Sequence, residues 1–351
     1  MERFSCRTQI ICGGGALNEL KSLGAKRLLM VCDPYFYENG KAQELAGLTG
    51  CESVEFFTKV TPDPSVALAA EGAGIVQNVQ PDVILSLGGG SAMGLAKAMA
   101  FFAKSPAKRI AIPTTSGSGS EVTDFAILTH DGVKHPLVDP SLRPDIAIVD
   151  PQLVEKLPTS LVADGGFDVL THALEALVAK NASPITDALA LSAFSMAFRN
   201  LPDSYAGNLA ARAQVHLAST MAAMAFNQAG LGICHALAHS LGGAHHVPHG
   251  RLNAILLPPV IRHLDCPKYT HAAGAIGLEN RSRTMALRNL HNGLVRLRKQ
   301  LGLPATLAEI GIRPQFDQII PAALADPCCN TNPVPVTQEL AAKILHEATH
   351  G

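Results

Sequence analysis

One carboxylate and a group of histidines in the second half of the chain have the types and spacing of metal ligands. Asp168 and His172 lie four residues apart in GGFDVLTHALEAL. On a helix, side chains at this spacing share one face and can converge on one ion. Five of the 14 histidines then crowd into residues 235–249. A carboxylate with imidazoles suits Fe2+ or Zn2+, so the sequence predicts a divalent metal site, although spacing alone does not choose among the five histidines.

A glycine run directly follows the apolar segment Val83–Leu87 and precedes a helical pattern. It reads Gly88, Gly89, Gly90 and then Ser91. Glycines let the backbone approach a phosphate, and a helix N-terminus supplies free N–H donors and a favourable dipole. The spacing is not that of the GxGxxG fingerprint, so a plain Rossmann motif is not predicted. A phosphate-binding loop and a tight strand-to-helix turn stay open as alternatives.

The segment PTTSGSGSE, residues 113–121, follows a second apolar run. Its hydroxyls and glycines suit a diphosphate and a ribose. A flexible Ser/Gly linker has the same composition. A linker does not normally lie directly against a buried strand, so the position of the segment favours ligand binding.

Asp33 ends a third apolar run, LLMVC. A carboxylate at this point can accept hydrogen bonds from an adenosine ribose and would repel a 2′-phosphate, which favours NAD over NADP. The alternative is an aspartate that caps a turn or helix before Pro34. Gly13–Gly15 has weaker strand and helix context, and we expect a turn there.

The elements that must position these residues alternate along the first half of the chain. The predicted strands are Leu28–Cys32, Val54–Phe57, Val83–Leu87, Arg109–Ile112 and Ile146–Val149, and the predicted helices are Ser65–Gln77 and Ala92–Ala103. Continuous apolar strands that alternate with helices are typical of a parallel sheet covered on both faces.

Helical patterns replace the strand signals after about Pro158. The predicted helices are Leu161–Ala179, Thr186–Arg199, Asn208–Phe226, His235–Leu241, Thr284–Gln300 and Gln338–His350. We expect Gly242 and Gly243 to end the fourth of these helices and Pro248–Gly250 to form a turn. The sequence thus predicts an α/β dinucleotide-binding domain with a parallel sheet over 1–158 and an all-helical metal-binding domain over 159–351. The active site is expected in the cleft between them.

Composition excludes several classes of protein. The chain has 351 residues, 47% hydrophobic and 16% charged, with a net charge of −1. This charge does not suit nucleic-acid binding. Neither a signal peptide nor a membrane span is evident, so we expect a cytoplasmic protein without membrane contact. The eight cysteines lack paired metal spacing and are expected to be free thiols.

Taken together, these segments resemble the iron-containing (group III) alcohol dehydrogenases. The matching segments are LSLGGGSAMGLAKA, AIPTTSGSGSEVTDFAIL, PLVDPSLRPDIAIVDP, GGFDVLTHALEAL and GLGICHALAHSLGGAHHVPHGRLNAILLP. They are colinear and span most of residues 80–260. The chain looks most similar to the propanol and ethanol dehydrogenases of diol, ethanolamine and choline breakdown, some of which work inside bacterial microcompartments. The resemblance implies the fold of this family, which is like that of dehydroquinate synthase.

The resemblance implies a choice among the histidines. The family's metal ligands correspond to Asp168, His172, His235 and His249. His239, the second histidine of HxxxH, is not a ligand in the family. It lies near the nicotinamide there and is a candidate for proton transfer. His245 and His246 match no family ligand, so we expect them in a loop near the cleft.

The resemblance also implies a set of NAD-binding residues. Asp33 would bind the adenosine ribose, and Lys134 matches a family lysine near the cofactor. The loop residues that would bind NAD are Gly89, Gly90, Ser91, Thr114, Thr115 and Ser118. The family usually has aspartate where this chain has Gly94. The chain is also somewhat shorter than typical members, before Arg109 and in the C-terminal helices.

The activity implied by the resemblance is reversible hydride transfer between an alcohol and NAD, with Fe2+ or, as an alternative, Zn2+ as the metal. Short-chain aldehydes such as propionaldehyde and acetaldehyde are the expected substrates, and a homodimer or larger assembly is expected. We expect no targeting helix for a microcompartment before the first strand. A glycerol or diol dehydrogenase, a dehydroquinate-synthase-like enzyme and an inactive NAD- or metal-binding module are the alternatives.

Overall fold

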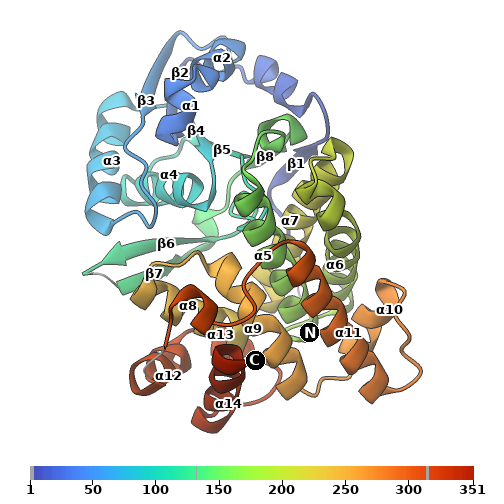
Figure 1. The fold of residues 1–351 in the computed structure, drawn as a ribbon. Coiled ribbons are helices and arrows are strands. Elements are labelled where there is room, and N and C mark those ends of the chain that lie inside the picture. The colour runs from blue at the N-terminus through green and yellow to red at the C-terminus, as the bar shows by residue number, and fades with distance from the viewer. Residues whose placement is uncertain (1–3, 132, 314–315) are drawn as a thin grey trace. The chain divides into compact units, whose positions relative to one another are not determined.

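The computed structural model describes residues 4–131, 133–313 and 316–351. The chain divides into two compact units, Ser5–Lys156 and Leu157–Gly351, and Phe4 belongs to the second. Figure 1 shows a sheet with helices in the first unit and helices in the second. The predicted fold class, an α/β unit followed by a helical one, agrees with this arrangement.

The main sheet of the first unit has six parallel strands. They are β1 (Gln9–Cys12), β2 (Arg27–Cys32), β3 (Ser53–Phe57), β4 (Val83–Gly88), β5 (Lys108–Pro113) and β8 (Ile146–Val149). Their order is β1-β8-β5-β4-β2-β3, and every neighbouring pair is parallel. In a parallel sheet all carboxyl ends lie at one edge, so the loops after β2, β4 and β5 are neighbours.

Alternate residues of β2 pack on opposite faces of this sheet, as the pleat requires. Leu28 and Met30 belong to a core with the 3-10 helix η1 (Ala16–Ser22) and α2 (Lys41–Leu48). Leu29 and Val31 belong to a second core with α3 (Val66–Val79) and α4 (Gly90–Phe102). Both faces are covered, which explains why the strands have continuous apolar sequences instead of alternating ones.

Some elements of the first unit were not predicted. β1 is the short edge strand QIIC, with little apolar context. β6 (Phe125–His130) and β7 (Val133–Val138) form a separate antiparallel pair. Short helical elements follow β2, β7 and β8, namely α1 (Pro34–Glu38), η2 (Pro140–Leu142) and η3 (Pro151–Val154). The predicted turn at Gly13–Gly15 is present.

The regular elements among the described residues of the second unit are all helices. Its helices are α5 (Thr159–Val178), α6 (Pro184–Tyr205), α7 (Leu209–Ala229), α8 (Ile233–His245), α9 (His249–His263), α10 (Tyr269–Ala275), α11 (Arg283–Gln300), η4 (Ala308–Ile310), α12 (Phe316–Ala325), α13 (Cys328–Thr331) and α14 (Gln338–His350). The six predicted helices correspond to α5, α6, α7, α8, α11 and α14. α9 was missed because Pro258 and Pro259 lie inside it, and proline normally breaks a helix.

Two local predictions near the histidines were wrong. α8 continues through Gly242 and Gly243 to His245, because an interior glycine costs a helix only about 1 kcal/mol. The segment after it is not a turn: Pro248 is the N-cap of α9, whose first residue is His249. The exposed His245 is therefore the last helical residue instead of a loop residue, and the exposed His246 ends α8 in a left-handed conformation.

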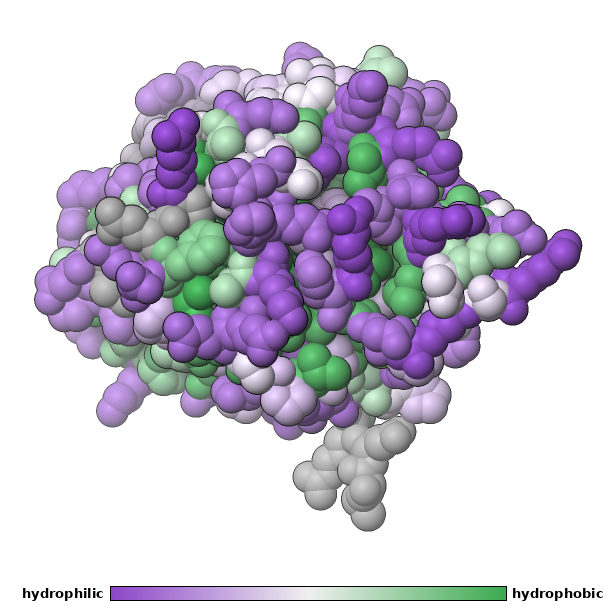
Figure 2. Space-filling model, turned by 60° about the horizontal axis from the view of Figure 1, so that its bottom comes forward, coloured by the Kyte–Doolittle hydropathy of each residue, from purple (hydrophilic) through white to green (hydrophobic). Residues whose placement is uncertain are grey.

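The surface and the cysteines agree with the composition. Among the described residues, no helix is long and apolar enough to cross a membrane. On the face drawn in Figure 2, hydrophilic side chains predominate and hydrophobic ones lie scattered between them. All eight cysteines are free thiols, as predicted.

Candidate metal centre and nucleotide-binding loops

The two predicted nucleotide-binding loops meet at the carboxyl ends of neighbouring strands. Asp33 follows β2, Gly88 ends β4 and Pro113 ends β5. The amide N of Asp33 donates to the carbonyl O of Leu87 at 3.2 Å, and that of Thr114 donates to the carbonyl O of Gly88 at 3.0 Å. The structure therefore brings Asp33 and both loops together.

Glycines in the first loop permit this close approach. Gly88 has a φ of 156°, and a Cβ there would lie 2.6 Å from a side-chain atom of α4. A Cβ at Gly89 would lie 3.2 Å from Oγ1 of Thr115, and one at Gly90 would lie 3.1 Å from Oγ of Ser118. The first loop therefore packs directly on two of the predicted NAD-binding residues of the second.

The N-terminus of α4 has the chemistry of an anion site. The N-cap residue of α4 is Gly89, which has no side chain that could accept a hydrogen bond from the first turn. The half-buried Gly90 and Ser91 begin the helix. The first N–H groups of a helix have no acceptor within it and lie at the positive end of its dipole. This end of α4 suits a diphosphate, and its assignment to NAD stays a prediction.

A buried lysine on the same helix holds the second loop. Lys97 is 2% exposed. Its Nζ donates to Oγ of Ser120, to the carbonyl O and Oγ1 of Thr123, and to the carbonyl O of Phe125, each at 3.0 Å. Burial lowers the pKa of Lys97 to about 7, although nearby carboxylates oppose the shift. Because α4 begins in the first loop and carries Lys97, one helix fixes both loops.

Asp33 and Lys134 have partners within the first unit. Oδ1 of Asp33 accepts the N–H of Tyr35 at 3.0 Å, so Asp33 does cap α1, the alternative left open by the sequence. Nζ of Lys134, on β7, lies 2.7 Å from Oδ1 of Asp63. Asp33 also lies beside the glycine loop, whereas the structure pairs Lys134 with Asp63. The roles of Asp33 and Lys134 toward NAD stay predictions.

Gly94 is buried in α4. A Cβ there would meet Ala126 at an ordinary 3.8 Å. Close packing of the backbone therefore does not account for glycine at the position where the family usually has aspartate.

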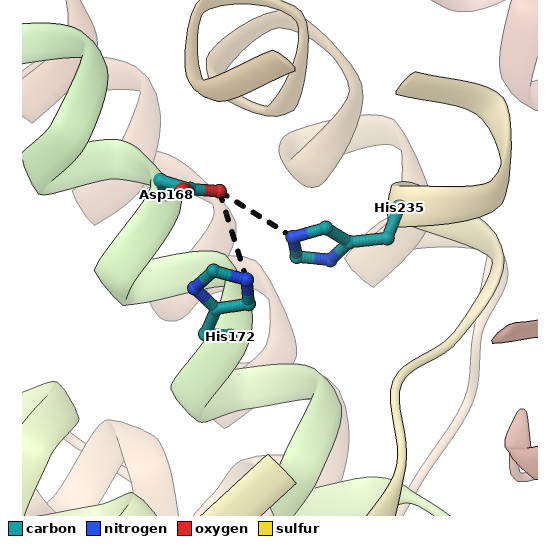
Figure 3. A group of neighbouring side chains, drawn as sticks. All are labelled: Asp168, His172 and His235. Carbon is teal, nitrogen blue, oxygen red and sulfur yellow. Dashed lines mark hydrogen bonds and ion pairs between the residues drawn. The ribbon is translucent and has the colours of Figure 1, made fainter. Parts of the chain in front are cut away.

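Three of the four predicted metal ligands form a buried cluster in the helical unit (Figure 3). Oδ1 of Asp168 lies 3.9 Å from Nε2 of His172 and 3.4 Å from Nε2 of His235. One ligand atom from each residue lies within 4.8 Å of the other two. Figure 3 shows Asp168 and His172 on α5 and His235 on α8, with both imidazoles close to the carboxylate. The predicted i, i+4 pair and one of the five histidines do converge.

His249 approaches the same carboxylate from the start of α9. Its Nε2 lies 3.0 Å from Oδ2 of Asp168. The His249 side chain is 45% exposed, whereas the other three ligand candidates are buried. The cluster is therefore accessible on the His249 side.

The first residues of α9 pack tightly on α5, which explains how His249 reaches Asp168. A Cβ at Gly250 would overlap the carbonyl O of Asp164. Two guanidinium nitrogens of Arg251 donate to the two carboxylate oxygens of Asp164, at 3.1 and 2.9 Å. The glycine of the PHG segment thus allows the close approach, and the bidentate ion pair next to it holds the two helices together.

The electrostatics of the cluster favour the metal-binding protonation states of Asp168 and His172, whereas the carboxylates around His235 favour its protonated form until a cation takes the place of the proton. Burial would raise the pKa of Asp168, but the imidazoles of His172 and His249 outweigh it and hold that pKa well below its usual range. Burial lowers the pKa of His172 to about 3. For His235, burial also lowers the pKa, but hydrogen bonds with Asp168 and Glu175 outweigh it and raise the pKa. An ionised carboxylate and a neutral imidazole are metal-binding forms.

The donor set fits a divalent metal ion. His172 is 5% exposed, and its Nδ1 has no hydrogen-bond partner among the described residues. Its Nε2 approaches Asp168 at 3.9 Å, which is too long for a hydrogen bond. Nε2 therefore faces the carboxylate without a hydrogen bond to it, which leaves its lone pair available to a metal ion. One carboxylate with three imidazoles suits Fe2+ and Zn2+.

His239 belongs to a second group, one helical turn beyond His235 on α8. Its Nδ1 lies 2.9 Å from Oδ2 of Asp326, whose Oδ1 accepts the N–H of Cys328 at 2.8 Å. The His239 and His249 rings are 6.3 Å apart, centroid to centroid. Burial would raise the pKa of Asp326, but the hydrogen bond with His239 outweighs it, so the pKa falls to about 2. The arrangement holds His239 beside the metal cluster without making it part of that cluster.

Comparison with known families matches both units of the chain. The model described as iron-containing alcohol dehydrogenase matches residues 7–151. The model described as Fe-containing alcohol dehydrogenase family, C-terminal, matches residues 162–349. The chain belongs to the iron-containing alcohol dehydrogenase family. The predicted family and the predicted class of enzyme are confirmed.

Individual relatives of this iron-containing alcohol dehydrogenase cover nearly the whole chain. It is 40% identical to the 1-propanol dehydrogenase PduQ of Citrobacter freundii, over 99% of this chain and 100% of that protein. The structure of the iron-containing alcohol dehydrogenase of Thermococcus thioreducens has a TM-score of 0.92 and 31% identity, covering 99% and 100% of the two chains. The sulfoacetaldehyde reductase of Bifidobacterium kashiwanohense in complex with NAD+ has a TM-score of 0.92 and 27% identity, covering 100% and 99%.

These comparisons confirm the predicted fold. They also confirm the cofactor prediction at the level of the family, since the family is described as iron-containing and a relative has been solved with NAD+.

The sequence did not reveal three polar residues around the metal centre of the dehydrogenase: Glu175, Asn253 and Asp326. Glu175 lies seven residues after Asp168 on α5, and Asn253 lies four after His249 on α9. This helical spacing was a usable signal, because polar residues on one face of an apolar helix share their surroundings. Asp326 had no such signal, since 87 residues separate it from His239.

Proposed function

We propose that the chain is an NAD-dependent alcohol dehydrogenase that reversibly reduces short-chain aldehydes, such as propionaldehyde and acetaldehyde, to primary alcohols. The convergence of His172, His235 and His249 on the carboxylate of Asp168 carries the proposal. The resemblance to a protein named 1-propanol dehydrogenase supports the substrate class.

Asp168, His172, His235 and His249 would hold the metal, and Fe2+ is proposed because the family is described as iron-containing. Zn2+ suits the same ligands, so availability decides between them. When bound, the metal acts as a Lewis acid that polarises the aldehyde carbonyl, and NADH supplies the hydride. The four residues give that site one negative charge against the ion's two positive charges, which leaves it electrophilic.

His239 would transfer the proton that accompanies the hydride. Asp326 binds Nδ1 of His239 at 2.9 Å, so Nε2 is the nitrogen left for exchange with the substrate or a ribose hydroxyl. The carboxylate also stabilises the imidazolium form that follows when the alcohol gives up its proton. Asp326 orients the ring and touches no reactant in this scheme.

Asp33, Gly89, Gly90, Ser91, Thr114, Thr115, Ser118 and Lys134 would bind NAD. The open N-terminus of α4 supports placement of the diphosphate there. The carboxylate of Asp33 supports NAD over NADP, because it would repel a 2′-phosphate. NADH should therefore have a lower KM than NADPH.

A homodimer in the cytoplasm, packaged in some settings inside a bacterial microcompartment, is the proposed cellular form. It rests on the resemblance to the dehydrogenases of diol and ethanolamine breakdown. No nucleic-acid partner is proposed, since the net charge is −1.

NADH oxidation by the anaerobically purified chain with Fe2+ tests the proposal. Acetaldehyde, propionaldehyde and longer aldehydes should be reduced, and propionaldehyde should have a higher kcat/KM than dihydroxyacetone. A preference for dihydroxyacetone, with glycerol oxidised in reverse, would instead indicate a polyol dehydrogenase. No turnover of any aldehyde by a chain that binds both metal and NADH would indicate an inactive binding module.

A further inference from the structure

Glu175 is a buried carboxylate on α5 that the proposed reaction does not use. Its side chain is 3% exposed, and it lies three residues after His172 on the same helix. Its ion-pair partner among the described residues is a histidine rather than a lysine or arginine. Burying a carboxylate is costly unless hydrogen bonds compensate, and Glu175 has two.

Each oxygen of Glu175 has a different partner at the start of α8. Oε2 lies 2.6 Å from Nδ1 of His235. Oε1 accepts the backbone N–H of Cys234 at 2.7 Å. A single carboxylate thus binds both the first turn of α8 and the imidazole that this turn carries.

The contact with Glu175 determines which nitrogen of His235 faces Asp168. An ionised carboxylate can only accept, so Nδ1 of His235 must carry the hydrogen. In the neutral ring that binds a metal, the other nitrogen, Nε2, has the lone pair, and it lies 3.4 Å from Oδ1 of Asp168. The neighbouring amide of Asn253 is consistent with an acceptor at this nitrogen. Its Nδ2 donates to Oδ1 of Asp168 at 2.9 Å and lies 3.2 Å from Nε2 of His235.

The orientation of the Asn253 amide is supported independently. Its Oδ1 faces Sγ of Cys234 at 3.6 Å, within reach of a thiol donor. The amide N is therefore the atom turned toward Asp168 and His235.

The backbone around Glu175 leaves little freedom for this carboxylate to move. A Cβ at Gly232 would lie 2.9 Å from Oε1 of Glu175 and 2.7 Å from Oδ1 of Asn332. Asn332 accepts the N–H of Ile233 at 3.1 Å. The first turn of α8 is thus capped by two side chains, of which Glu175 also contacts a ligand candidate and Asn332 does not.

We propose that Glu175 is a positioning residue of the metal centre, which fixes His235 in the tautomer that presents Nε2 to the metal and anchors that ring to the first turn of α8. A carboxylate on the outer nitrogen also raises the basicity of a ligating imidazole. The inference rests on the proposed metal site at Asp168, His172, His235 and His249, and it adds the residue that orients one of the ligands.

Glu175→Gln in the full chain tests the proposal. Glutamine has nearly the same shape and can still accept the N–H of Cys234, but it turns an NH2 donor toward Nδ1 of His235. The ring must then protonate Nε2 or give up the contact. The apo protein would be titrated with Co2+ against a chelator, and we expect affinity to fall about 10- to 100-fold. The visible spectrum of the Co2+ form should also change.

Asn332→Ala is the matched control, because Asn332 caps the same helix turn without touching His235. Its Co2+ affinity should remain within about threefold of that of the unmodified chain, and NADH affinity should be unchanged in both variants. If Glu175→Gln does not fold, Glu175→Asp, which keeps the charge at a shorter reach, should still bind Co2+ more weakly than Asn332→Ala.

Three results would overturn the proposal, and they are distinguishable. If the unmodified chain binds no metal, the proposed metal site is wrong, and the role of Glu175 is wrong with it. If Glu175→Gln binds Co2+ as tightly as the unmodified chain, the positioning role alone is wrong. If Glu175→Gln and Asn332→Ala weaken binding equally, Glu175 is a helix cap and no more.

Discussion

The nucleotide loops of Ser5–Lys156 depend on the absence of side chains, whereas the metal centre of Leu157–Gly351 depends on a few side chains held by others. In the loops, a Cβ added at any of the glycines 88–90 would lie within 3.2 Å of a neighbouring atom. In the metal centre, ligands from α5, α8 and α9 converge on Asp168, and the sequence separation reaches 81 residues. Close backbone packing shapes the proposed site in one unit, and converging charged and aromatic side chains shape it in the other.

This difference predicts different sensitivities. Added volume at the glycines of the loops should weaken NADH binding and leave metal binding unchanged. The metal centre should respond to the loss of one ligand and also to added volume where α9 packs on α5. Four substitutions test the contrast, and we order them by the size of their expected effect.

Asp168→Ala should have the largest effect, because this carboxylate contacts all three candidate imidazoles. We expect loss of bound metal and a fall in kcat of about 10³-fold or more, with NADH affinity unchanged. Metal analysis measures the bound metal, and NADH fluorescence measures the affinity for NADH. Asp150→Ala is the control, since Asp150 is 1% exposed and accepts the N–H groups of Leu17 and Gln152 in the other unit. Full metal content in Asp168→Ala would remove Asp168 from the ligand set.

His239→Ala should separate proton transfer from metal binding. Because His239 is held by Asp326 and lies outside the metal cluster, we expect kcat to fall about 10²-fold while metal content stays at that of the unmodified chain. Steady-state kinetics and metal analysis provide both readings. His245→Ala, at the exposed end of the same helix, should change neither. Metal loss in His239→Ala would make this histidine a ligand and contradict its assigned role.

Gly250→Ala should show that the metal centre also depends on backbone packing. The added Cβ overlaps the carbonyl O of Asp164, so α9 and His249 must move away from α5. We expect metal affinity to fall on the order of tenfold and the melting temperature to drop. Gly243→Ala is the matched control, because a Cβ there meets nothing within 4 Å. It should stabilise α8 by about 0.5–1 kcal/mol. Equal behaviour of the two variants would contradict the packing argument.

Gly90→Ala should have the smallest effect, and this effect should be confined to nucleotide binding. A Cβ there would press on Ser118 at 3.1 Å, a side chain that can move by a few tenths of an ångström. We expect NADH affinity to weaken about three- to tenfold, roughly 1 kcal/mol, with metal affinity unchanged. Isothermal titration with NADH measures the shift. Gly74→Ala in α3 is the control, because a Cβ there meets nothing within 4 Å, and it should leave NADH affinity unchanged. An equal loss of NADH affinity in that variant would contradict the assignment of the Gly90 loop to the nucleotide.

The same contrast explains what the sequence could predict. Each nucleotide loop is one contiguous segment after one strand, so GGGS and TTSGSGS were visible as candidates, and the parallel sheet followed from the apolar runs. Asp168 and His172 were visible because one helix carries both. The choice of His235 and His249 came from the family resemblance, since no local rule states which helices will pack around α5.

The residues that the sequence did not reveal act through tertiary contacts. Glu175 has a regular helical spacing from Asp168, but its partner His235 is 60 residues away. Asp326 reaches His239 from the short segment between α12 and α13, 87 residues further along the chain. The glycines at 242 and 243 were predicted to end a helix, yet α8 continues through them, because tertiary packing outweighs their low intrinsic propensity.

We propose that one divalent ion bound by Asp168, His172, His235 and His249 is required for turnover. Anaerobic removal of metal, followed by stepwise addition of Fe2+ and assay of NADH oxidation with propionaldehyde, tests it most directly. We expect negligible activity without metal, a linear rise with added Fe2+ and a break at one ion per chain. Full turnover by the metal-free chain, or an identical Fe2+ titration in Asp168→Ala, would contradict it.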